Sequence, residues 1–395
     1  MIKVLIVDDS KFIRFNLEQM FPNVSDIQVV GTARNGVEAL DFLKQNSVDV
    51  VILDFFMPKM DGLETLAEIM THHMIPTIMI TIANQSEHAD LYFSALKLGA
   101  FEIIPKPTGR DSLYVDTLAE TLKDRIRAAY HAKPKISEVN KNHEVLKEIL
   151  EKGKKVIDEI NRKQQEYEQS RAVDFQKTQR SLPNQNLSSF SIPSVRSPDQ
   201  VPSGFISPCN LLVIGASTGG PGKIIELLSV FSRKMNTITV IVQHMPSGFT
   251  YHFAERLNTI NNHHCSEAKH GELLIPGNCY VAPGDYHLRF ALSGSDIYCV
   301  LDQEERINGL RPAIDYTFIS GAYVFRKRMV GVVLTGMGND GSEGVKHIKQ
   351  VGGIVIVQSL EEALISSMPE KALRTNCVDH IAPVNEIGKI LNRLL

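Results

Sequence analysis

Two stretches of the chain alternate short runs of β-branched apolar residues with longer segments of helical periodicity. In the first stretch the strand candidates are residues 3–7, 48–53 and 76–81. In the second they are residues 210–217, 237–244, 328–336 and 352–359. Strands that alternate with helices predict βαβ units and a parallel sheet. The sequence therefore predicts two α/β domains, one in each stretch.

The region between the two stretches differs from both in composition. Residues 135–180 contain 20 charged side chains among 46 residues, with a thin apolar stripe that allows a single helix. Residues 181–208 contain 8 Ser and 5 Pro, a composition typical of a linker. We expect one domain over residues 1–130, a charged helical segment and linker over 131–208, and a second domain over 209–395.

Glycine-flanked segments complicate the second domain. Residues 271–284 and 286–294 have the pattern of hairpin strands with Gly turns. The expected fold is a doubly wound, mostly parallel α/β sheet that carries an antiparallel hairpin. The first domain, with its simpler alternation, is expected to be a parallel α/β sheet.

Composition excludes several classes of protein. The net charge is −3, with 42 basic and 45 acidic residues, so nucleic acid is not expected as a partner. The 5 cysteines form no CxxC pair, which favours a reducing compartment. No signal-peptide pattern and no run of about 18 apolar residues is found, so membrane insertion is not expected. We expect a cytoplasmic protein.

Polar residues follow the strand candidates of the first domain. Asp8 and Asp9 follow the first strand, Asp54 follows the second, and Thr81 and Lys106 end two later ones. Because parallel strands end at one edge of a sheet, these side chains are expected to converge. Three carboxylates repel one another unless a cation compensates, and Mg²⁺ prefers oxygen ligands. Lys106 and Thr81 are suited to hold the oxygens of a phosphoryl group on Asp54.

The motifs VDD, LDFFMPKMDG and KP resemble those of the receiver domain of response regulators, over about residues 1–125. The resemblance implies a flavodoxin-like order of strands, and it implies that Asp54 accepts a phosphoryl group from a chemotaxis histidine kinase. It also implies that Asp9, Asp54 and the backbone carbonyl of Phe56 bind Mg²⁺, with Asp8 nearby. Thr81 and Lys106 would then sense the phosphoryl group. Ile103 stands where many receivers carry an aromatic switch residue.

The second domain presents a hydroxyl, an imidazole and a carboxyl group after three strands. Ser217 lies in the turn GASTGG, His244 ends the next strand, and Asp340 lies in LTGMGNDG. A dinucleotide-binding turn is the weaker interpretation, because GxGxxG is absent and the following strand ends without an acidic residue. A serine becomes nucleophilic when a base lies within reach and a third group orients that base. The peptide N–H groups near Thr218 and Met337 are candidates for an oxyanion hole.

The motifs GASTGG, QHMPSGFT, VAPGDYHL, RPAIDYTF and LTGMGNDG resemble the chemotaxis receptor methylesterases of the CheB type, over nearly all of residues 209–395. The resemblance implies Ser217 as nucleophile, His244 as general base and acid, and Asp340 as its orienting partner, with no cofactor for the esterase reaction. It implies glutamyl methyl esters on the cytoplasmic domains of chemoreceptors as substrates, and glutamines as further substrates for deamidation. Ser367 stands where the family usually has Gly.

Both sets of motifs in one chain predict an esterase that phosphorylation activates, with the receiver limiting access to Ser217 at rest. The alternative is a non-enzymatic signalling adaptor, in which a receiver is joined to an α/β binding module. A DNA-binding response regulator is disfavoured because no basic helix-turn-helix segment is found.

Overall fold

The computed structural model describes residues 1–22, 24–82, 89–106, 112–136, 146–159, 162, 207–260 and 262–395. Most of the predicted charged segment and linker lies outside the described residues. The chain divides into two compact units, Met1–Ser191 and Ile192–Leu395. Each unit is described by itself below.

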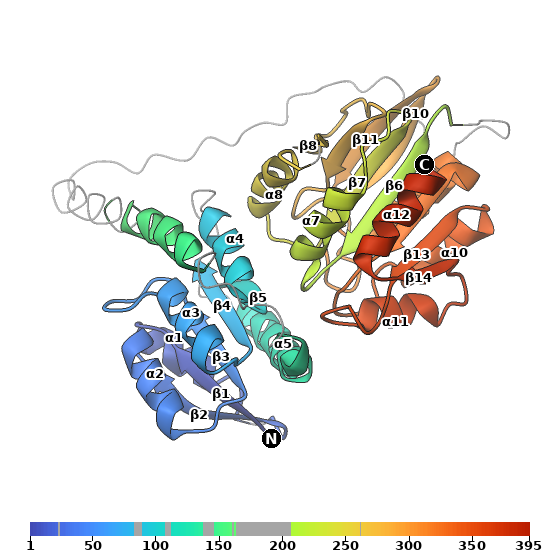
Figure 1. Ribbon diagram of the computed structural model, residues 1–395. Helices are drawn as coiled ribbons and strands as arrows, with labels where there is room; N and C mark the ends of the chain where they lie inside the picture. Colours follow the sequence, from blue (N-terminus) through green and yellow to red (C-terminus); the bar gives the residue numbers. More distant parts are fainter. Residues whose placement is uncertain are drawn as a thin grey trace, which may run out of the picture. The chain divides into compact units, whose positions relative to one another are not determined.

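The first unit alternates strands and helices, as its sequence pattern predicts (Figure 1). Its strands are β1 (Ile2–Val7), β2 (Ile27–Ala33), β3 (Val50–Asp54), β4 (Thr77–Ile82) and β5 (Glu102–Lys106). Its helices are α1 (Lys11–Glu18), α2 (Gly36–Gln45), α3 (Gly62–His72), α4 (Ala89–Leu98) and α5 (Ser112–Ile136). The strands form one parallel sheet in the order β2-β1-β3-β4-β5. This is the flavodoxin-like order, which confirms the predicted fold class.

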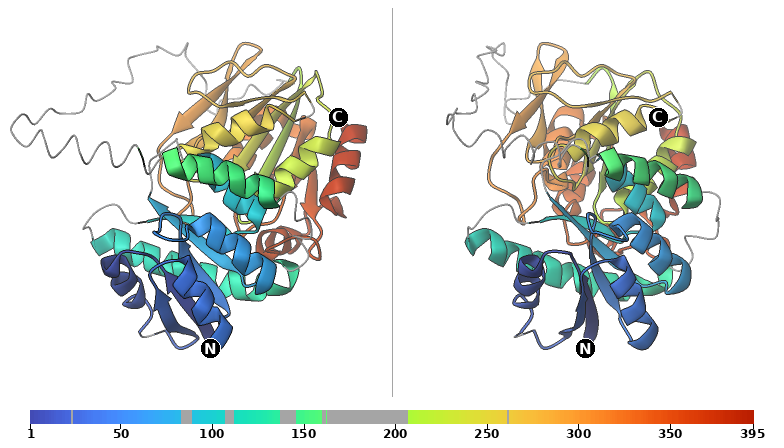
Figure 2. Two further views of the ribbon diagram at one scale, coloured as in Figure 1. Left: turned by 60° about the vertical axis from the view of Figure 1, so that its left-hand side comes forward. Right: turned by 90° about the vertical axis from the view of Figure 1, so that its left-hand side faces the viewer.

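Buried aliphatic strands explain why helices cover both faces of this sheet. Every residue of β3 is buried, and α2 and α3 lie on the opposite side of the sheet from α5 (Figure 2). Helix α1 has large apolar side chains at helical spacing, but they do not all pack against the sheet. Phe12 and Phe15 are 69% and 57% exposed, and only Leu17 within the helix is buried.

A further helix, residues 146–159, lies against the first unit through one narrow side. Leu146, Ile149 and Ile157 are buried. A Cβ placed on Gly153 would lie 2.5 Å from a methyl carbon of Leu63 in α3. The thin apolar stripe that predicts a helix in this charged region is therefore the side that packs.

The second unit contains the remaining described elements. Its strands are β6 (Asn210–Ala216), β7 (Thr237–Gln243), β8 (His264–Glu267), β9 (Asn278–Val281), β10 (His287–Ser293), β11 (Asp296–Asp302), β12 (Met329–Val333), β13 (Ile354–Gln358) and β14 (His380–Ala382). Its helices are α7 (Gly220–Val230), α8 (Phe249–Leu257), α9 (Ile314–Phe325), the 3-10 helix η3 (Arg326–Arg328), α10 (Ser342–Gln350), α11 (Ser367–Leu373) and α12 (Val384–Leu394).

Seven of these strands form a parallel sheet in the order β14-β13-β12-β6-β7-β9-β8. Alternate residues of β6 face opposite sides, so Leu211 and Val213 join the core with α9 and α10. Figure 1 shows α7, α8 and α12 over the other face. Because both faces are covered, the central strands β6, β7, β12 and β13 are mostly apolar and almost wholly buried, whereas the edge strands β8 and β14 are partly exposed.

The antiparallel pair is β10 with β11, joined through Gly294 in a left-handed conformation. The expectation that residues 271–284 contribute a hairpin strand is confirmed only at their start, where Leu273 forms an antiparallel bridge with Tyr298 of β11. The strand within this segment, β9, instead pairs in parallel with both β7 and β8. Its short apolar run is buried inside the main sheet, and alternation alone does not distinguish a parallel from an antiparallel partner.

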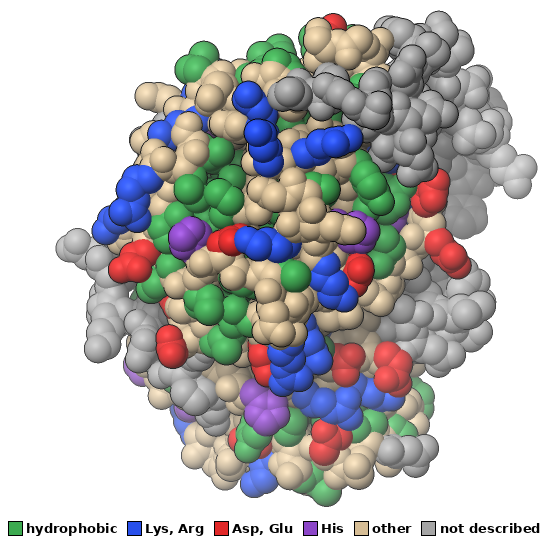
Figure 3. Space-filling model, turned by 90° about the vertical axis from the view of Figure 1, so that its right-hand side faces the viewer, with side chains coloured by type: hydrophobic (Ala, Val, Ile, Leu, Met, Phe, Trp, Pro, Cys, Tyr) green, Lys and Arg blue, Asp and Glu red, His purple; other side chains and the backbone are tan. Residues whose placement is uncertain are grey.

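None of the helices that the structure describes combines the length and the apolar character needed to cross a lipid bilayer. Lysine and arginine side chains are spread over much of the face drawn in Figure 3, several of them beside acidic ones.

Candidate active site

Ser217 lies directly after β6, at the point where the strand order reverses. Strand β7 follows on one side of β6 and β12 lies on the other. Such a switch point opens a crevice at the carboxyl edge of a doubly wound sheet. The Ser217 N–H donates to the Thr335 carbonyl at 3.0 Å, and the Ser217 carbonyl accepts from the Gly220 N–H at 2.8 Å and from Gln243 Nε2 at 3.0 Å. The turn is therefore held on both sides.

Glycine is required at two positions of this turn. Gly219 has a φ of 78°, which favours a residue without a side chain. A Cβ on Gly220 would lie 2.2 Å from Gln243 Oε1. Gly219 is also the N-cap of α7, so Ser217 lies in the turn before the helix and does not cap it.

His244 and Asp340 form a direct pair. His244 Nε2 lies 2.7 Å from Asp340 Oδ2, and both side chains are buried. Burial by itself raises the pKa of Asp340, but the hydrogen bond and the charge of His244 outweigh it and hold that pKa below its ordinary value. Asp340 is therefore a carboxylate at neutral pH and can stabilise a protonated imidazole.

Asp340 is also held by backbone groups of a second segment. Its Oδ2 accepts from the Ile314 N–H at 2.7 Å, and its Oδ1 accepts from the Asp315 N–H at 2.8 Å and the Gly341 N–H at 3.0 Å. The first two donors belong to the first turn of α9. The sequence motif RPAIDYTF thus contributes peptide groups to the site.

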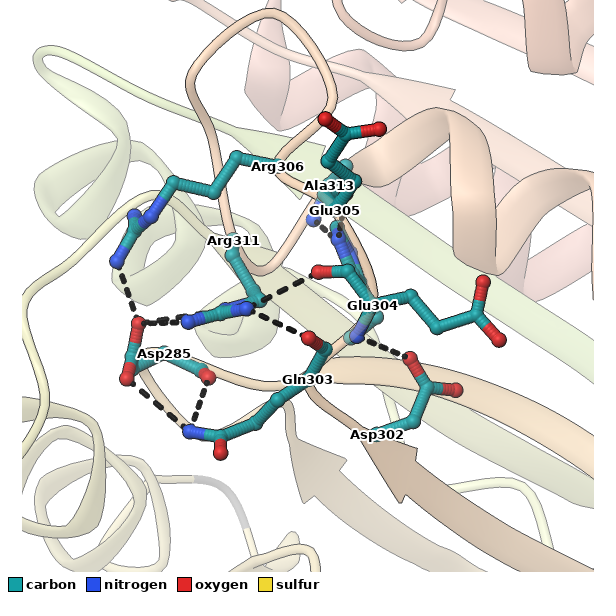
Figure 4. A network of polar contacts seen from close by, with 9 residues as sticks. Asp285, Asp302, Gln303, Glu304, Glu305, Arg306, Arg311 and Ala313 are labelled. Carbon is teal, nitrogen blue, oxygen red and sulfur yellow. Dashed lines mark hydrogen bonds and ion pairs between the residues drawn. The ribbon is translucent and has the colours of Figure 1, made fainter.

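The segment before α9 is anchored by the polar network of Figure 4. Arg311 Nη2 lies 2.8 Å from Asp285 Oδ1, and Arg311 Nη1 donates to the carbonyls of Gln303 and Glu304 at 2.9 and 3.0 Å. Arg311 therefore ties the loop after β11 to the start of α9, whose N–H groups hold Asp340.

The second ring nitrogen of His244 is the free one. The His244 N–H donates to the Ala216 carbonyl at 3.1 Å, so His244 and Ser217 end neighbouring strands. His244 Nδ1 is buried and has no hydrogen-bond partner among the described residues. The structure thus joins His244 to Asp340 and brings Ser217 alongside, but among these residues no hydrogen bond joins Ser217 Oγ to the ring.

Residues 336–338 form a loop that lies against Ser217. A Cβ on Gly336 would lie 2.7 Å from Ser217 Cβ and 2.2 Å from Met368 Sδ, so only glycine allows this approach. Ser367 Oγ accepts from the Gly338 N–H at 3.1 Å and donates to the Gly336 carbonyl at 3.0 Å. Met337, between these two residues, is half-buried and forms no hydrogen bond through its N–H to the described part of the chain.

The sequence analysis did not identify the residues that hold the backbone of the Ser217 turn through hydrogen bonds. Thr335 Oγ1 donates to the Thr218 carbonyl at 3.0 Å, and the Thr335 N–H donates to Gln358 Oε1 at 2.7 Å. Thr335 and Gln358 are polar residues that end or follow apolar strands. That position is the sequence feature by which they, and likewise Gln243, could have been identified as site residues.

The acidic residues of the first unit converge as their positions predict. Oxygen atoms of Asp8, Asp9 and Asp54 lie within 4.8 Å of one another. Lys106 Nζ lies 2.9 Å from Asp8 Oδ2 and 2.6 Å from Asp54 Oδ2. Ser10 is the N-cap of α1, so Asp8 and Asp9 do not serve as caps.

Thr81 and Phe56 flank this group. Thr81 is buried near the end of β4, next to Ile80, which pairs with Asp54 in the register. Phe56 follows β3 and is half-buried. Ile103, at the position of the missing aromatic, is buried in β5.

Burial raises the pKa of Asp54 to about 7, against the lowering effect of Lys106 and with a further raising effect of Asp8. Asp54 Oδ1 is buried and accepts no hydrogen bond from the described residues. A buried oxygen without a donor, in a group of three carboxyls, is the arrangement that a divalent cation satisfies. The residues present therefore fit Mg²⁺.

These two sites define the class of the protein as a receiver domain joined to a doubly wound α/β enzyme domain. Residues 4–117 match the response regulator receiver domain, and residues 212–391 match the CheB methylesterase family.

Two similar proteins named protein-glutamate methylesterase/protein-glutamine glutaminase span nearly the whole chain. The one from Pyrococcus horikoshii is 36% identical over 98% of this chain and 91% of its own. The one from Syntrophomonas wolfei, numbered 1 in its name, is 34% identical over 98% of this chain and 97% of its own. The solved catalytic domain of the Thermotoga maritima CheB methylesterase is 35% identical and covers 47% of this chain and 99% of its own, with a TM-score of 0.46.

The chain belongs to the CheB methylesterase family. It is an enzyme of the methylesterase class that carries a response regulator receiver domain, which confirms the resemblance of both sets of motifs.

Proposed function

We propose that this protein is a phosphorylation-activated serine esterase that hydrolyses glutamyl methyl esters on chemoreceptors and deamidates their glutamines. The single observation that carries the catalytic part is the His244–Asp340 pair at 2.7 Å, with the buried and unpaired His244 Nδ1 beside the strand end that bears Ser217. A buried imidazole nitrogen without a partner is well suited to accept the proton of a neighbouring hydroxyl.

In the proposed reaction, Ser217 Oγ forms a bond to the ester carbonyl carbon while its proton passes to His244 Nδ1. The carbonyl oxygen becomes an oxyanion near the Thr218 and Met337 N–H groups. The bond to the methoxy oxygen then breaks, and methanol leaves with the proton from His244. Water, deprotonated by His244, attacks the acyl carbon. The bond from that carbon to Ser217 Oγ then breaks, Oγ takes the proton back from His244, and glutamate is released. With a glutamine substrate, ammonia replaces methanol.

The proposed role of Asp340 is to orient His244 and to stabilise its protonated form. Three peptide N–H groups hold the Asp340 carboxylate, so it can keep one ring orientation through the reaction. Because Asp340 binds Nε2, the proton-transferring nitrogen in this chain is Nδ1.

In the receiver, Asp54 is the proposed phosphoacceptor and a chemotaxis histidine kinase the phosphodonor. Asp9, Asp54 and the Phe56 carbonyl would hold Mg²⁺, with Asp8 nearby, and the cation would neutralise charge on the phosphoryl oxygens. Lys106, already within 2.6 Å of Asp54 Oδ2, would move to a phosphoryl oxygen together with the Thr81 hydroxyl. This exchange of partners at the ends of β4 and β5 is the proposed signal that relieves inhibition of the esterase.

Methanol release from a methyl-esterified chemoreceptor domain tests the proposal. We expect Ser217→Ala in the full chain to reduce the rate by several orders of magnitude, since the nucleophile is lost. Ser293→Ala, a change to a partly buried serine in the β10–β11 hairpin of the same unit, is the matched control for folding. If Ser217→Ala kept its rate, the serine esterase assignment would be wrong. If neither the unaltered protein nor Ser217→Ala released methanol, while both supported chemotactic signalling, the non-enzymatic adaptor alternative would hold.

A further inference from the structure

A cavity of about 600 Å³ in the second unit adjoins the loop that lies against Ser217. Met337 and Asn339 form one wall, and these residues immediately precede Asp340. Ser367, which holds the same loop through two hydrogen bonds, forms another part of the wall. The cavity, a shallow depression mostly open to solvent, therefore borders the loop that lies against Ser217.

The charge of this cavity has one sign. Lys346 of α10, Lys371 of α11 and Arg374, the C-cap of α11, line it, and no carboxylate is among its lining residues. The rest of its wall is polar or apolar but neutral. Three cations in one concave surface favour an anion, because a concave wall concentrates the field of its charges.

Two of these cations have only weak partners. Lys346 pairs with Glu343 at 2.6 Å, three residues earlier on the same helix, with both side chains about half exposed. Arg374 pairs with Glu370 four residues earlier on α11, again at the surface. Exposed pairs of this kind contribute little net free energy, so an incoming carboxylate can replace the partner at little cost.

Lys371 is the third cation, and it has no ion-pair or hydrogen-bond partner within the described part of the chain. It is exposed and lies with the other two on the cavity wall. An exposed ammonium group beside a proposed active site, without a carboxylate of its own, is available to a substrate.

We propose that this cavity binds carboxylate side chains that flank the scissile ester on the polypeptide substrate. The inference rests on the proposed function, because it assigns a substrate preference to the same site. The enzyme would select glutamyl esters in acidic segments, with Lys371 and Arg374 as specificity-determining residues and Lys346 as a further contact.

The test uses two synthetic helical peptides, each with one glutamyl methyl ester. One has glutamates on both sides of the ester, and its twin has glutamines. The full chain is assayed with a small phosphodonor, and the readout is the ratio of kcat/KM for the acidic peptide to that for the neutral one. Ser217→Ala is assayed on both peptides, so loss of the esterase assignment is visible separately.

We expect the unaltered protein to favour the acidic peptide about tenfold at low salt, with the ratio falling as salt rises. Lys371→Gln should lower the ratio about threefold, and Lys371→Glu should bring it to one or below. Lys389→Gln, an exposed charge change on α12 away from the cavity, is the control and should keep the ratio.

An equal ratio in the unaltered protein, Lys371→Glu and Lys389→Gln would overturn the proposal, even with full Ser217-dependent hydrolysis. The proposal also fails if Lys371→Glu and Lys389→Gln lower the ratio equally, since the preference would then come from overall charge. Melting temperatures within about 2 °C of the unaltered protein show that the variants fold.

Discussion

At the scale of single residues, the geometry of the candidate active site depends on glycines and polar side chains that hold the Ser217 turn and the loop beside it. Gly336 lets a loop approach Ser217, Gln243 and Thr335 hold the backbone of the turn, and Ser367 holds the loop itself. None of these residues reacts in the proposed mechanism. Their effect is to limit the positions that the reacting atoms can take, which in enzymes contributes as much as the reacting groups.

Ser367→Ala tests this positioning. The change removes both hydrogen bonds that flank Met337, so the Met337 N–H becomes less well aimed at the oxyanion. We expect kcat to fall about tenfold while KM changes less than about twofold. Ser367→Thr, which keeps a hydroxyl, should restore most of the rate. The adjacent change Ser366→Ala is the control, because Ser366 caps α11 without a side-chain hydrogen bond; an equal loss in both alanine variants would refute the role of Ser367.

Asp315 gives the second unit a pH-dependent stability. Burial, and then the charge of Asp340, raise the pKa of Asp315 to about 7. The folded state therefore binds this proton more tightly than the unfolded chain, whose aspartate has a pKa near 3.8. Stability from this group is full below about pH 4 and is lost as the pH rises to about 7.

The corresponding variant is Asp315→Asn, whose amide oxygen can still accept the Gly344 N–H that Asp315 accepts at 2.6 Å. Relative to the unaltered protein, this variant should gain about 2–3 kcal/mol of unfolding free energy between about pH 5 and pH 8. Calorimetry of the full chain at several pH values measures the difference. Asp296→Asn, at an exposed position of the hairpin, should show no such trend; parallel curves for Asp315→Asn would contradict the prediction.

At the scale of elements, the helix formed by residues 146–159 is the least expected contact of the first unit. Lys154 Nζ lies 2.8 Å from Glu64 Oε1, and Gly153 faces Leu63, so both contacts reach the first turn of α3. Since the ion pair is exposed, the apolar stripe must provide most of the binding.

Gly153→Val should displace this helix from the receiver. A Cβ at residue 153 would lie 2.5 Å from Leu63 Cδ1, and Leu63 is itself buried, so a branched side chain is expected to push the two elements apart. We expect amide hydrogen exchange to rise at least about tenfold in residues 146–159 while the strands of the receiver stay protected. Lys155→Val adds the same side chain on the exposed side and is the control; unchanged exchange in Gly153→Val would show that the contact does not persist in solution.

At the scale of the whole molecule, two α/β units share one principle of construction, with the proposed chemistry at the carboxyl edge of a parallel sheet in each. In the first unit the edge gathers carboxylates and a lysine, and in the second it gathers a hydroxyl, an imidazole and a carboxylate. The proposed link between them is the phosphorylation of Asp54.

Removal of Mg²⁺ tests the first half of that link. We expect Mg²⁺ at about ten times its dissociation constant to raise the unfolding free energy of the receiver by about 1.4 kcal/mol, and EDTA to reverse this. Asp9→Asn should abolish most of the effect, whereas Asp41→Asn, at an exposed residue paired with Lys44, should leave it intact. Equal stabilisation of both variants would mean that the cation binds elsewhere.

The fold class, the convergence of Asp8, Asp9, Asp54 and Lys106, and the placement of Ser217, His244 and Asp340 at strand ends were all predictable from sequence. Periodicity determines which residues are buried, and in a parallel sheet every strand ends at the same edge. The pairing of β9, the packed side of residues 146–159 and the exposure of Phe12 were not predictable, because each depends on which neighbour is present.

By itself, the sequence determined two parallel sheets and the polar residues that end their strands, because alternation and turn chemistry are local properties of the chain. The packing of whole elements established that Asp340 binds Nε2 of His244, that Nδ1 stays without a partner among the described residues, that N–H groups of α9 hold Asp340, and that three cations share one cavity wall. These contacts join residues distant along the chain, and their distances follow from the packing of whole elements.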